Sequence, residues 1–506
     1  MNDCMSRSNR RIFIIGGIAT VGTAVLTARP ALSVPYPFTL GVASGDPASD
    51  GFVIWTRLAP SPLNSDGLGG MSSAPVTVEW QVADDQFFTQ LTQTGTVTAV
   101  QTSAHSVHVE VAGLQSGREY WYRFRASGHI SQVGRARTAP ALGTSPTMTM
   151  LFASCSHFES GYFTAYRRMA EENPDLILHL GDYIYEGGAG SGVRTHVPSV
   201  EISSLANYRV RHAQYKRDVD LQAAHAAAPW LPVWDDHEVE NNYANLIRAD
   251  SSPPGDFRAR RAAAYQAYYE HMPLRAAQAP VAENMQLYRR IRWGSLATFH
   301  MLDTRQYRDD QACGDGTKVC AAADDPTRTI TGTGQESWLL SGMGQHLATW
   351  DLIGQQVFFA QKLASSAGDR NMDAWDGYTA NRGRIQQGWD AQGNTSTVVL
   401  TGDVHRSWAC NLMDNYTTQN RIIGTELVAT SITSSGDGNA TENALSPLNP
   451  HVKFYKNLRG YVRTVTTPTQ MTADFRALSK VTVRDYPVMT VQSYVIQAGI
   501  PGLQAP

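Results

Sequence analysis

The chain has 506 residues, which exceeds one compact core and predicts two or three domains. Hydrophobic residues make up 42% and charged residues 17% of the sequence, and this composition excludes a disordered protein. With 42 Lys and Arg against 45 Asp and Glu the net charge is −3, so we expect no nucleic-acid partner beyond a possible substrate.

Residues 1–33 have the pattern of a cleaved signal peptide. Arg10 and Arg11 precede an apolar run from Ile12 to Leu26, which spans only ~22 Å as a helix and is too short to cross a bilayer. The paired arginines indicate a twin-arginine signal, with a general secretory signal as the alternative. We therefore expect export by the twin-arginine machinery, a periplasmic or secreted protein, and no stable membrane anchor.

Residues 36–140 alternate between hydrophobic and polar positions at period two, interrupted by turn residues. This pattern predicts short strands at Phe52–Trp55, Val76–Val82, Val107–Val111 and Tyr120–Phe124. We expect an antiparallel β-sandwich, and the segment Gly113–Tyr120 resembles a turn of fibronectin type III domains. We favour a packing domain beside a catalytic unit, and a carbohydrate-binding module is the alternative.

After a linker at Pro140–Pro146, the pattern changes to that of an α/β domain over residues 147–500. Apolar strands are expected at Met148–Ser154, Leu176–Leu180, Leu231–Trp234, Ala297–Leu302, Val357–Ala360 and Val398–Leu400. Helical stretches at Gly161–Glu172 and Phe257–His271 separate some of them, which predicts parallel strands buried on both faces. A later segment, Tyr455–Gln504, is a candidate to fold over the site.

Four of these strands are followed by side chains that bind metals. The first three clusters are Ala153–His157, Gly181–Glu186 and Asp235–Asn242. The fourth, Gly402–Trp408, follows the last strand. Because sites in α/β folds lie beyond the carboxyl ends of the strands, we expect the four clusters to converge.

The residue types favour a centre of two or more metals. A carboxylate such as Asp182 can bridge two cations, and Tyr185 lies three residues further on. Cys thiolate and Tyr phenolate suit Fe(III), whereas carboxylate and amide oxygens suit Ca²⁺ or Mg²⁺. Such cations would clamp a phosphoryl group, and His237 would protonate the leaving oxygen.

The ordered motifs resemble a known family. G-D-x-x-Y, an Asx-His-Glu and G-x-V-H are similar to the skeleton of calcineurin-like and purple-acid-type metallophosphoesterases. The variants F-A-S-C-S, G-D-Y-I-Y-E, W-D-D-H-E-V-E-N-N-Y and T-G-D-V-H-R-S-W look like the PhoD family of alkaline phosphatases and phosphodiesterases. The resemblance covers roughly residues 36–500. It implies a four-layer core of two sheets flanked by helices.

The resemblance also implies Fe(III) with one or two Ca²⁺ ions. Cys155, Asp182, Tyr185 and His405 would bind iron, with Asp182 as the bridge. The second metal would take oxygen ligands, which the resemblance places at Asp236, Asp403 and, less strongly, Asn241 or Asn242. Asp182 and His237 would be the catalytic side chains, with attack by metal-bound hydroxide or oxide.

Some positions remain open. The related skeleton has a further histidine between the third and fourth motifs, where this chain offers only Gln355 or Gln356. Four arginines near the motifs are candidates to contact phosphate: Arg209, Arg211, Arg305 and Arg406. Cys313 and Cys320 lie in one polar loop and predict a disulfide in an oxidising compartment, whereas Cys410 is expected to be a core thiol.

These features predict an exported metal-dependent phosphatase or phosphodiesterase that hydrolyses phosphate esters at neutral to alkaline pH. The close alternative is a phosphodiesterase of phospholipase D type, acting on lipid or polymer diesters. A non-catalytic binding protein on the same scaffold is the alternative from another class.

Overall fold

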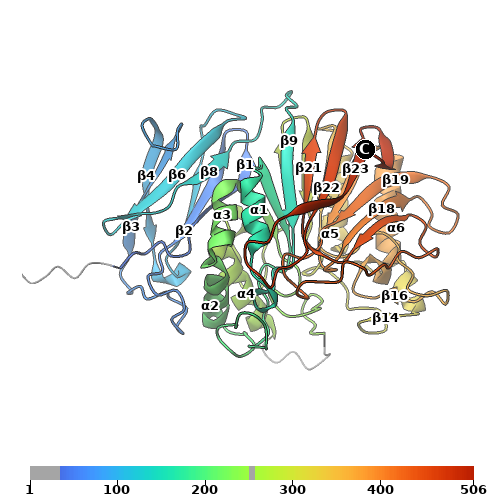
Figure 1. Cartoon of the computed structure of the whole chain (residues 1–506), viewed down its shortest axis with the longest axis horizontal. Helices are drawn as coiled ribbons and strands as arrows, with labels where there is room; N and C mark the ends of the chain where they lie inside the picture. The colour runs from blue at the N-terminus through green and yellow to red at the C-terminus, as the bar shows by residue number, and fades with distance from the viewer. Residues whose placement is uncertain (1–34, 250–256) are drawn as a thin grey trace, which may run out of the picture. The chain divides into compact units, whose positions relative to one another are not determined.

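Three short hydrophobic runs form the centre of the largest sheet among the described residues (Figure 1). The structure, a computed structural model, describes residues 35–249 and 257–506, so the expected signal peptide lies outside the described residues. Residues from Tyr36 onward form one unit. The ten-stranded sheet has the order β24 (Ile500–Gln504), β23 (Met489–Gln497), β22 (Gln470–Leu478), β21 (Arg459–Thr466), β9 (Met148–Ala153), β10 (Leu176–Leu180), β11 (Pro229–Val233), β1 (Val42–Ala48), β2 (Gly51–Arg57) and β5 (Ser106–Val111).

The strands β9, β10 and β11 pair in parallel, which confirms the expected β-α-β unit. Every residue of β10 and β11 is buried, because helices cover one face and the second sheet covers the other. That second sheet has seven strands in the order β12 (Arg289–Trp293), β13 (Ala297–Met301), β15 (Trp350–Gly354), β17 (Thr397–Thr401), β19 (Ile422–Val428), β18 (Ser407–Met413) and β20 (Val452–Lys456).

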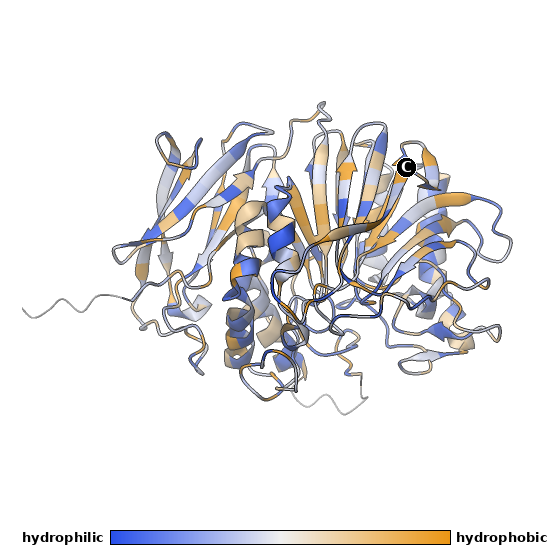
Figure 2. Ribbon diagram, in the orientation of Figure 1, coloured by the Kyte–Doolittle hydropathy of each residue, from blue (hydrophilic) through white to orange (hydrophobic). Residues whose placement is uncertain are grey.

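Successive side chains of a strand point to opposite faces of the sheet, and this alternation divides the core into two hydrophobic layers. Leu352 and Leu400 lie in the cluster that also holds Phe152 of the larger sheet. Their chain neighbours Ile353 and Val399 point the other way and pack with residues of the outer helices. Two stacked sheets between helices confirm the expected four-layer α/β core, and Figure 2 shows hydrophobic colour gathered on the strands.

The helices flank the two sheets. They are α1 (Thr164–Glu171), α2 (Leu205–Lys216), α3 (Val219–Ala227), α4 (Phe257–His271), α5 (Gly332–Met343) and α6 (Thr379–Ala391). Side-chain caps begin two of them, since Ser204 accepts from the backbone N–H of Asn207 and Asp218 accepts from that of Leu221. Short 3₁₀ turns lie at Gln101–Ser103, Phe158–Ser160, Ala276–Gln278, Ala321–Asp324 and Trp375–Gly377.

The N-terminal residues form antiparallel strands, as expected, but in two sheets. One is separate and contains β4 (Leu91–Ala99), β3 (Val76–Ala83), β6 (Glu119–Ala126), β7 (His129–Ile130) and β8 (Gly134–Arg137). The other consists of β1, β2 and β5, and β1 pairs in parallel with β11. The N-terminal part therefore shares a continuous sheet with the α/β core.

Two expectations differ from the structure. The expected strand at Val357–Ala360 is wrong, because this buried segment follows β15 as a loop. Its N–H groups at Phe359 and Ala360 donate to the Glu426 carboxylate at 2.8 Å, which replaces the partners that a strand ladder would supply. Most of the segment Tyr455–Gln504 extends the larger sheet instead of folding over the site: β21 pairs antiparallel with β9, and β22, β23 and β24 each pair antiparallel with the strand before. Only its first residues come near the motifs, where Arg459 donates to the backbone carbonyl of His405.

The described residues contain no helix that combines the length and the hydrophobicity needed to span a bilayer.

Candidate active site

The four predicted clusters meet at one edge of the stacked sheets, beyond the carboxyl ends of β9, β10, β11 and β17. Five of the expected ligand residues have positive φ angles between 51° and 62°, a region that side-chain-bearing residues rarely occupy. These residues are Cys155, Asp182, Asn242, Asp403 and His405. Left-handed backbone conformations in the turns after the strands therefore orient the candidate ligand side chains. Such strained conformations cluster at functional sites.

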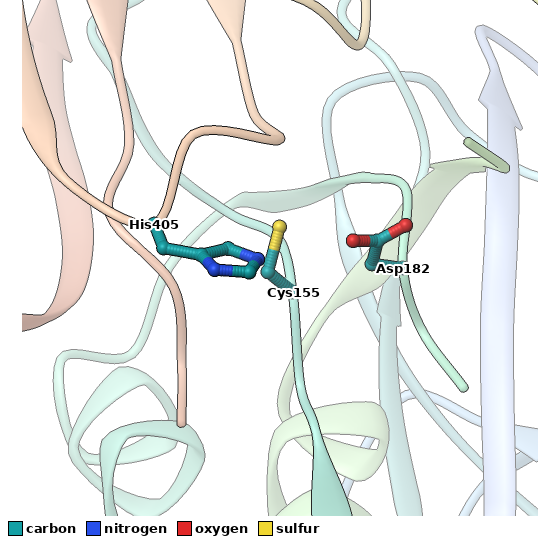
Figure 3. Close-up of side chains that lie close together, drawn as sticks. All are labelled: Cys155, Asp182 and His405. Atoms are coloured by element: carbon teal, nitrogen blue, oxygen red, sulfur yellow. The ribbon is translucent and has the colours of Figure 1, made fainter. Parts of the chain in front are cut away.

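Cys155, Asp182 and His405 converge although they lie far apart in the chain (Figure 3). One ligand atom from each lies within 4.8 Å of the others. The Tyr185 hydroxyl joins them, because it donates to the Asp182 Oδ2 at 2.9 Å and lies 3.2 Å from the His405 Nε2. Thiol, phenol, imidazole and carboxylate thus surround one point, as the sequence predicted.

Asp182 also belongs to a second group, with Asp236 and His237. One carboxylate oxygen of Asp182 and one of Asp236 are buried without a hydrogen-bond partner among the described residues. The other Asp236 oxygen accepts from the backbone N–H of Asn242 at 2.6 Å. Asn241, by contrast, has an exposed side chain. Asp182 therefore faces both groups, which fits a bridging role.

The carboxylate of Glu238 stabilises the backbone turns that carry the candidate ligands. Glu238 is buried and accepts from three backbone N–H groups, those of Asp182, Tyr183 and Asp235, at 2.6–3.1 Å. It therefore ties the turn after β10 to the turn after β11. The motif contains this glutamate, but only the fold shows that its partners are backbone groups.

Glu186 is a second residue whose role the sequence did not reveal. Its Oε2 lies 2.7 Å from the His237 Nδ1, and its Oε1 accepts from the backbone N–H of Asn241 at 2.7 Å. The Tyr185 ring packs against His237 with 4.2 Å between the ring centroids. The imidazole of His237 is thus held from two sides, with its Nε2 available for a reacting group.

Three of the four candidate arginines do not face a phosphate position. Arg305 is buried, with its Nε bonded to Asp235 at 2.5 Å and both terminal nitrogens bonded to Asp373 at 2.8 Å. Arg209 forms a buried pair with Glu270, and within the described residues Arg211 donates only to backbone carbonyls. Arg406 is half-buried and lines a cavity beside the site.

The two glutamines do not replace the missing histidine. The Gln355 amide bonds to Val357 and Thr401 and accepts from Trp375, and it is fully buried. The Gln356 amide bonds to the backbone of Leu302 and accepts from Thr304. Both amides brace the ends of neighbouring strands, so the expectation that one of them faces the metals is wrong.

A disulfide between Cys313 and Cys320 closes the polar loop, and Cys410 is a buried free thiol. The closed loop contains β14 (Thr317–Lys318), which pairs with β16 (Arg370–Asn371). Its Asp315 accepts from the Asn242 Nδ2 at 2.6 Å. This hydrogen bond fixes the amide so that its other atom, Oδ1, remains available as a ligand.

The electrostatics of the site fit bound cations. Burial raises the pKa of the Asp182 carboxyl well above its ordinary value, and neighbouring carboxylates raise it further. Burial, and then Asp182, likewise raise the pKa of the Cys155 thiol. Buried acidic groups of this kind need positive charge nearby to ionise. Together with the two unpartnered oxygens, the donor set thus fits metal ions.

Comparisons with known proteins agree with this geometry. A solved structure described as a structure of PhoD shares 49% identity, with a TM-score of 0.90 over 93% of this chain and 92% of that chain. A purple acid phosphatase from yellow lupin seeds shares the fold at 12% identity and a TM-score of 0.54, over 90% of this chain and 73% of that chain. The fold and site thus define a metallophosphoesterase.

The sequence comparisons narrow this class to a family. Residues 150–475 match the PhoD-like phosphatase family, and residues 24–140 match its N-terminal domain. Alkaline phosphatase D of Bacillus subtilis (strain 168) is 49% identical over 499 residues, which cover 96% of this chain and 85% of that protein. The chain belongs to the PhoD-like phosphatase family and is a phosphoric ester hydrolase. This result excludes the non-catalytic alternative.

Proposed function

We propose that the enzyme uses one Fe(III) and one or two Ca²⁺ ions. Cys155, Tyr185 and His405 would bind iron, because thiolate, phenolate and imidazole suit a transition metal. Asp236, Asn242 and Asp403 would bind Ca²⁺ through oxygen, the donor that calcium prefers. The unpartnered oxygens of Asp182 and Asp236 support this assignment, with Asp182 between the two kinds of ion.

The cations would neutralise the charge of the phosphoryl group and lower the pKa of a water molecule. His237 would supply the proton that the leaving oxygen needs, because the Glu186 carboxylate at 2.7 Å orients its ring and favours its charged form. The ring of Tyr185 holds the same imidazole from its face. The proposal is hydrolysis of phosphate esters with His237 as general acid.

Phosphodiester hydrolysis is the second candidate. The cavity beside Asp403 and His405 has a volume of about 570 Å³, which leaves room for a large ester substituent next to the site. Lipid or polymer diesters of the phospholipase D type would need such room, whereas a small monoester would not.

We also propose export by the twin-arginine machinery to the periplasm or the exterior. The paired Arg10 and Arg11 support the signal at residues 1–33, and the Cys313–Cys320 disulfide is typical of an oxidising compartment. Within the exported chain we assign residues 36–140 to the N-terminal β-sandwich domain and residues 147–500 to the catalytic domain.

The test of the reaction compares nitrophenyl phosphate with bis-nitrophenyl phosphate, with and without a calcium chelator. We expect hydrolysis of the monoester, its loss on chelation and its return when Ca²⁺ is added back. Preference for the diester would favour the second candidate. Full activity after prolonged chelation would contradict the calcium assignment, and metal analysis of the same sample would show which ions remain.

The hydrogen bond between Asp315 and Asn242 leads to a further prediction. Replacing Asp315 by alanine frees the Asn242 amide to rotate, so we expect ~10-fold weaker Ca²⁺ binding, as is typical when an orienting partner is lost. Calcium titration of the chelated protein measures this change. Asp325→Ala is the matched control, because Asp325 is exposed near the same loop and its carboxylate accepts hydrogen bonds only from Thr327 among the described residues. Equal affinities in both variants would show that Asp315 does not orient a ligand.

A further inference from the structure

A cavity of about 570 Å³ adjoins the candidate metal site on the side of the turn after β17. We call it the side cavity. It shares two residues with the candidate metal site. Its further lining comes from the loop after β15, from β16, β18 and β20, and from the segment between β19 and β20 that carries Glu442. The residues that matter for its chemistry are Asp403, His405, Lys362, Arg406, Trp408 and Tyr455. A group that extends from a phosphoryl group on the metals would enter this space.

The most unusual group in the side cavity is the ammonium of Lys362. It lies 4.8 Å from the ring centroid of Trp408 and 5.4 Å from that of Phe358. Within the described parts of the chain, it has no hydrogen-bond acceptor and no carboxylate in ion-pair contact. Aromatic faces stabilise a cation only modestly. The carboxylates of Asp376 and Asp403 also attract the ammonium, but neither forms an ion pair with it, so its N–H donors remain available for an anionic ligand.

Arg406 adds a second cation to the same cavity. Its Nε donates to the Glu442 carboxylate at 3.3 Å and to the Tyr455 hydroxyl at 3.1 Å. Glu442 therefore fixes the guanidinium, and the two terminal nitrogens are left without a hydrogen-bond partner among the described residues. A fixed guanidinium with free terminal N–H groups suits the oxygens of phosphate or carboxylate.

The two cations have no role in binding the metals, and metal ions would repel them. We propose that the side cavity binds a second anionic group of the substrate. The preferred substrates are then phosphate esters whose leaving part carries another phosphate or a carboxylate. This inference rests on the proposed phosphoesterase mechanism, and the hydrolysis itself is unchanged. The oxygen of water joins phosphorus, the ester P–O bond breaks, and the leaving oxygen takes a proton from His237. The proton released by the water passes to solvent, from which His237 regains one before the next turnover.

The experiment compares two esters of similar size, glycerol 3-phosphate and 3-phosphoglycerate, which differ by a carboxylate in the leaving part. We expect a lower KM for 3-phosphoglycerate in the unaltered enzyme. Lys362→Met should raise that KM by ~10-fold, the effect of losing one charge-assisted hydrogen bond. The KM for glycerol 3-phosphate and both kcat values should stay unchanged. Lys362→Arg, which keeps the charge, should retain the preference.

The matched control is Lys480→Met, since Lys480 is exposed and does not line the side cavity. Equal KM values for the two esters in the unaltered enzyme would overturn the inference, even if a variant failed to fold. Equal changes for both esters in Lys362→Met would also overturn it. Failure of the unaltered, metal-loaded enzyme to hydrolyse any ester would instead contradict the proposed mechanism, so the two outcomes are distinct.

Discussion

Replacing Asp182 by asparagine is expected to lower kcat/KM by more than ~100-fold. Loss of a residue that only orients a metal ligand costs up to about 100-fold, and loss of a ligand itself should cost more. Asp182 lies in two of the groups of side chains that could hold a metal ion. Under the proposed assignment, the change removes a negative charge from both kinds of ion. We therefore expect loss of iron and calcium together. Elemental analysis of the purified variant measures this loss beside the rate.

The control for this experiment is Asp376→Asn. Asp376 is also a buried aspartate, but its carboxylate bonds to Arg382 and to the backbone of Lys362, away from the metal-binding clusters. Loss of its ion pair should lower the melting temperature without changing the metal content. A fully active Asp182→Asn variant with both metals bound would contradict the bridging assignment.

The His237→Gln variant is expected to lose activity according to the leaving group. A general acid contributes typically ~10²–10⁴-fold, and most when the leaving oxygen is strongly basic. We expect a large fall in kcat for glycerol 3-phosphate and a much smaller one for nitrophenyl phosphate, whose leaving group departs readily without a proton. An equal fall for both esters would assign His237 to another role.

The pH dependence of kcat/KM tests whether Glu186 controls the pKa of His237. Burial alone lowers the pKa of the imidazole, but nearby carboxylates, Glu186 first among them, outweigh burial and raise the pKa of His237 well above its ordinary value. The acid form therefore persists into alkaline solution. Glu186→Gln removes one of these charges, so the pKa falls and the alkaline limb of kcat/KM should move to lower pH. An unmoved limb would show that His237 is not the group that titrates.

Sequence patterns were sufficient to predict the central strands and the convergence of the motif residues that follow them. The hydrophobic runs at β9 and β10 are short and bounded by turns, and Cys155, Asp182 and Asp403 each lie two residues after the end of a strand. Whether a residue lies next to the end of a strand can be inferred from the neighbouring sequence alone. Parallel pairing of β9 with β10 places Cys155 and Asp182 at one edge of the larger sheet. His405 follows β17 of the seven-stranded sheet, so it reaches them only because the two sheets are stacked.

The supporting residues were not predictable because their partners are distant in the chain. The sequence suggests Arg305 as a phosphate ligand. In the fold it bonds instead to Asp235 and Asp373, each of which is about 70 residues away in the chain. The segment Val357–Ala360 has a strand-like composition, yet Glu426 supplies its backbone partners from another strand. In each case a tertiary hydrogen bond overrides the local preference.

The parallel pairing of β1 with β11 has a consequence for how this enzyme can be taken apart. Residues 36–140 supply the neighbour that closes one side of β11, and Ser44 and Gly45 lie opposite its Pro229 and Trp230. A catalytic fragment that began after residue 140 would expose an open row of backbone N–H and C=O groups, which invites pairing between molecules. The catalytic domain is therefore not an independent folding unit, and a fusion of it to other domains must include β1.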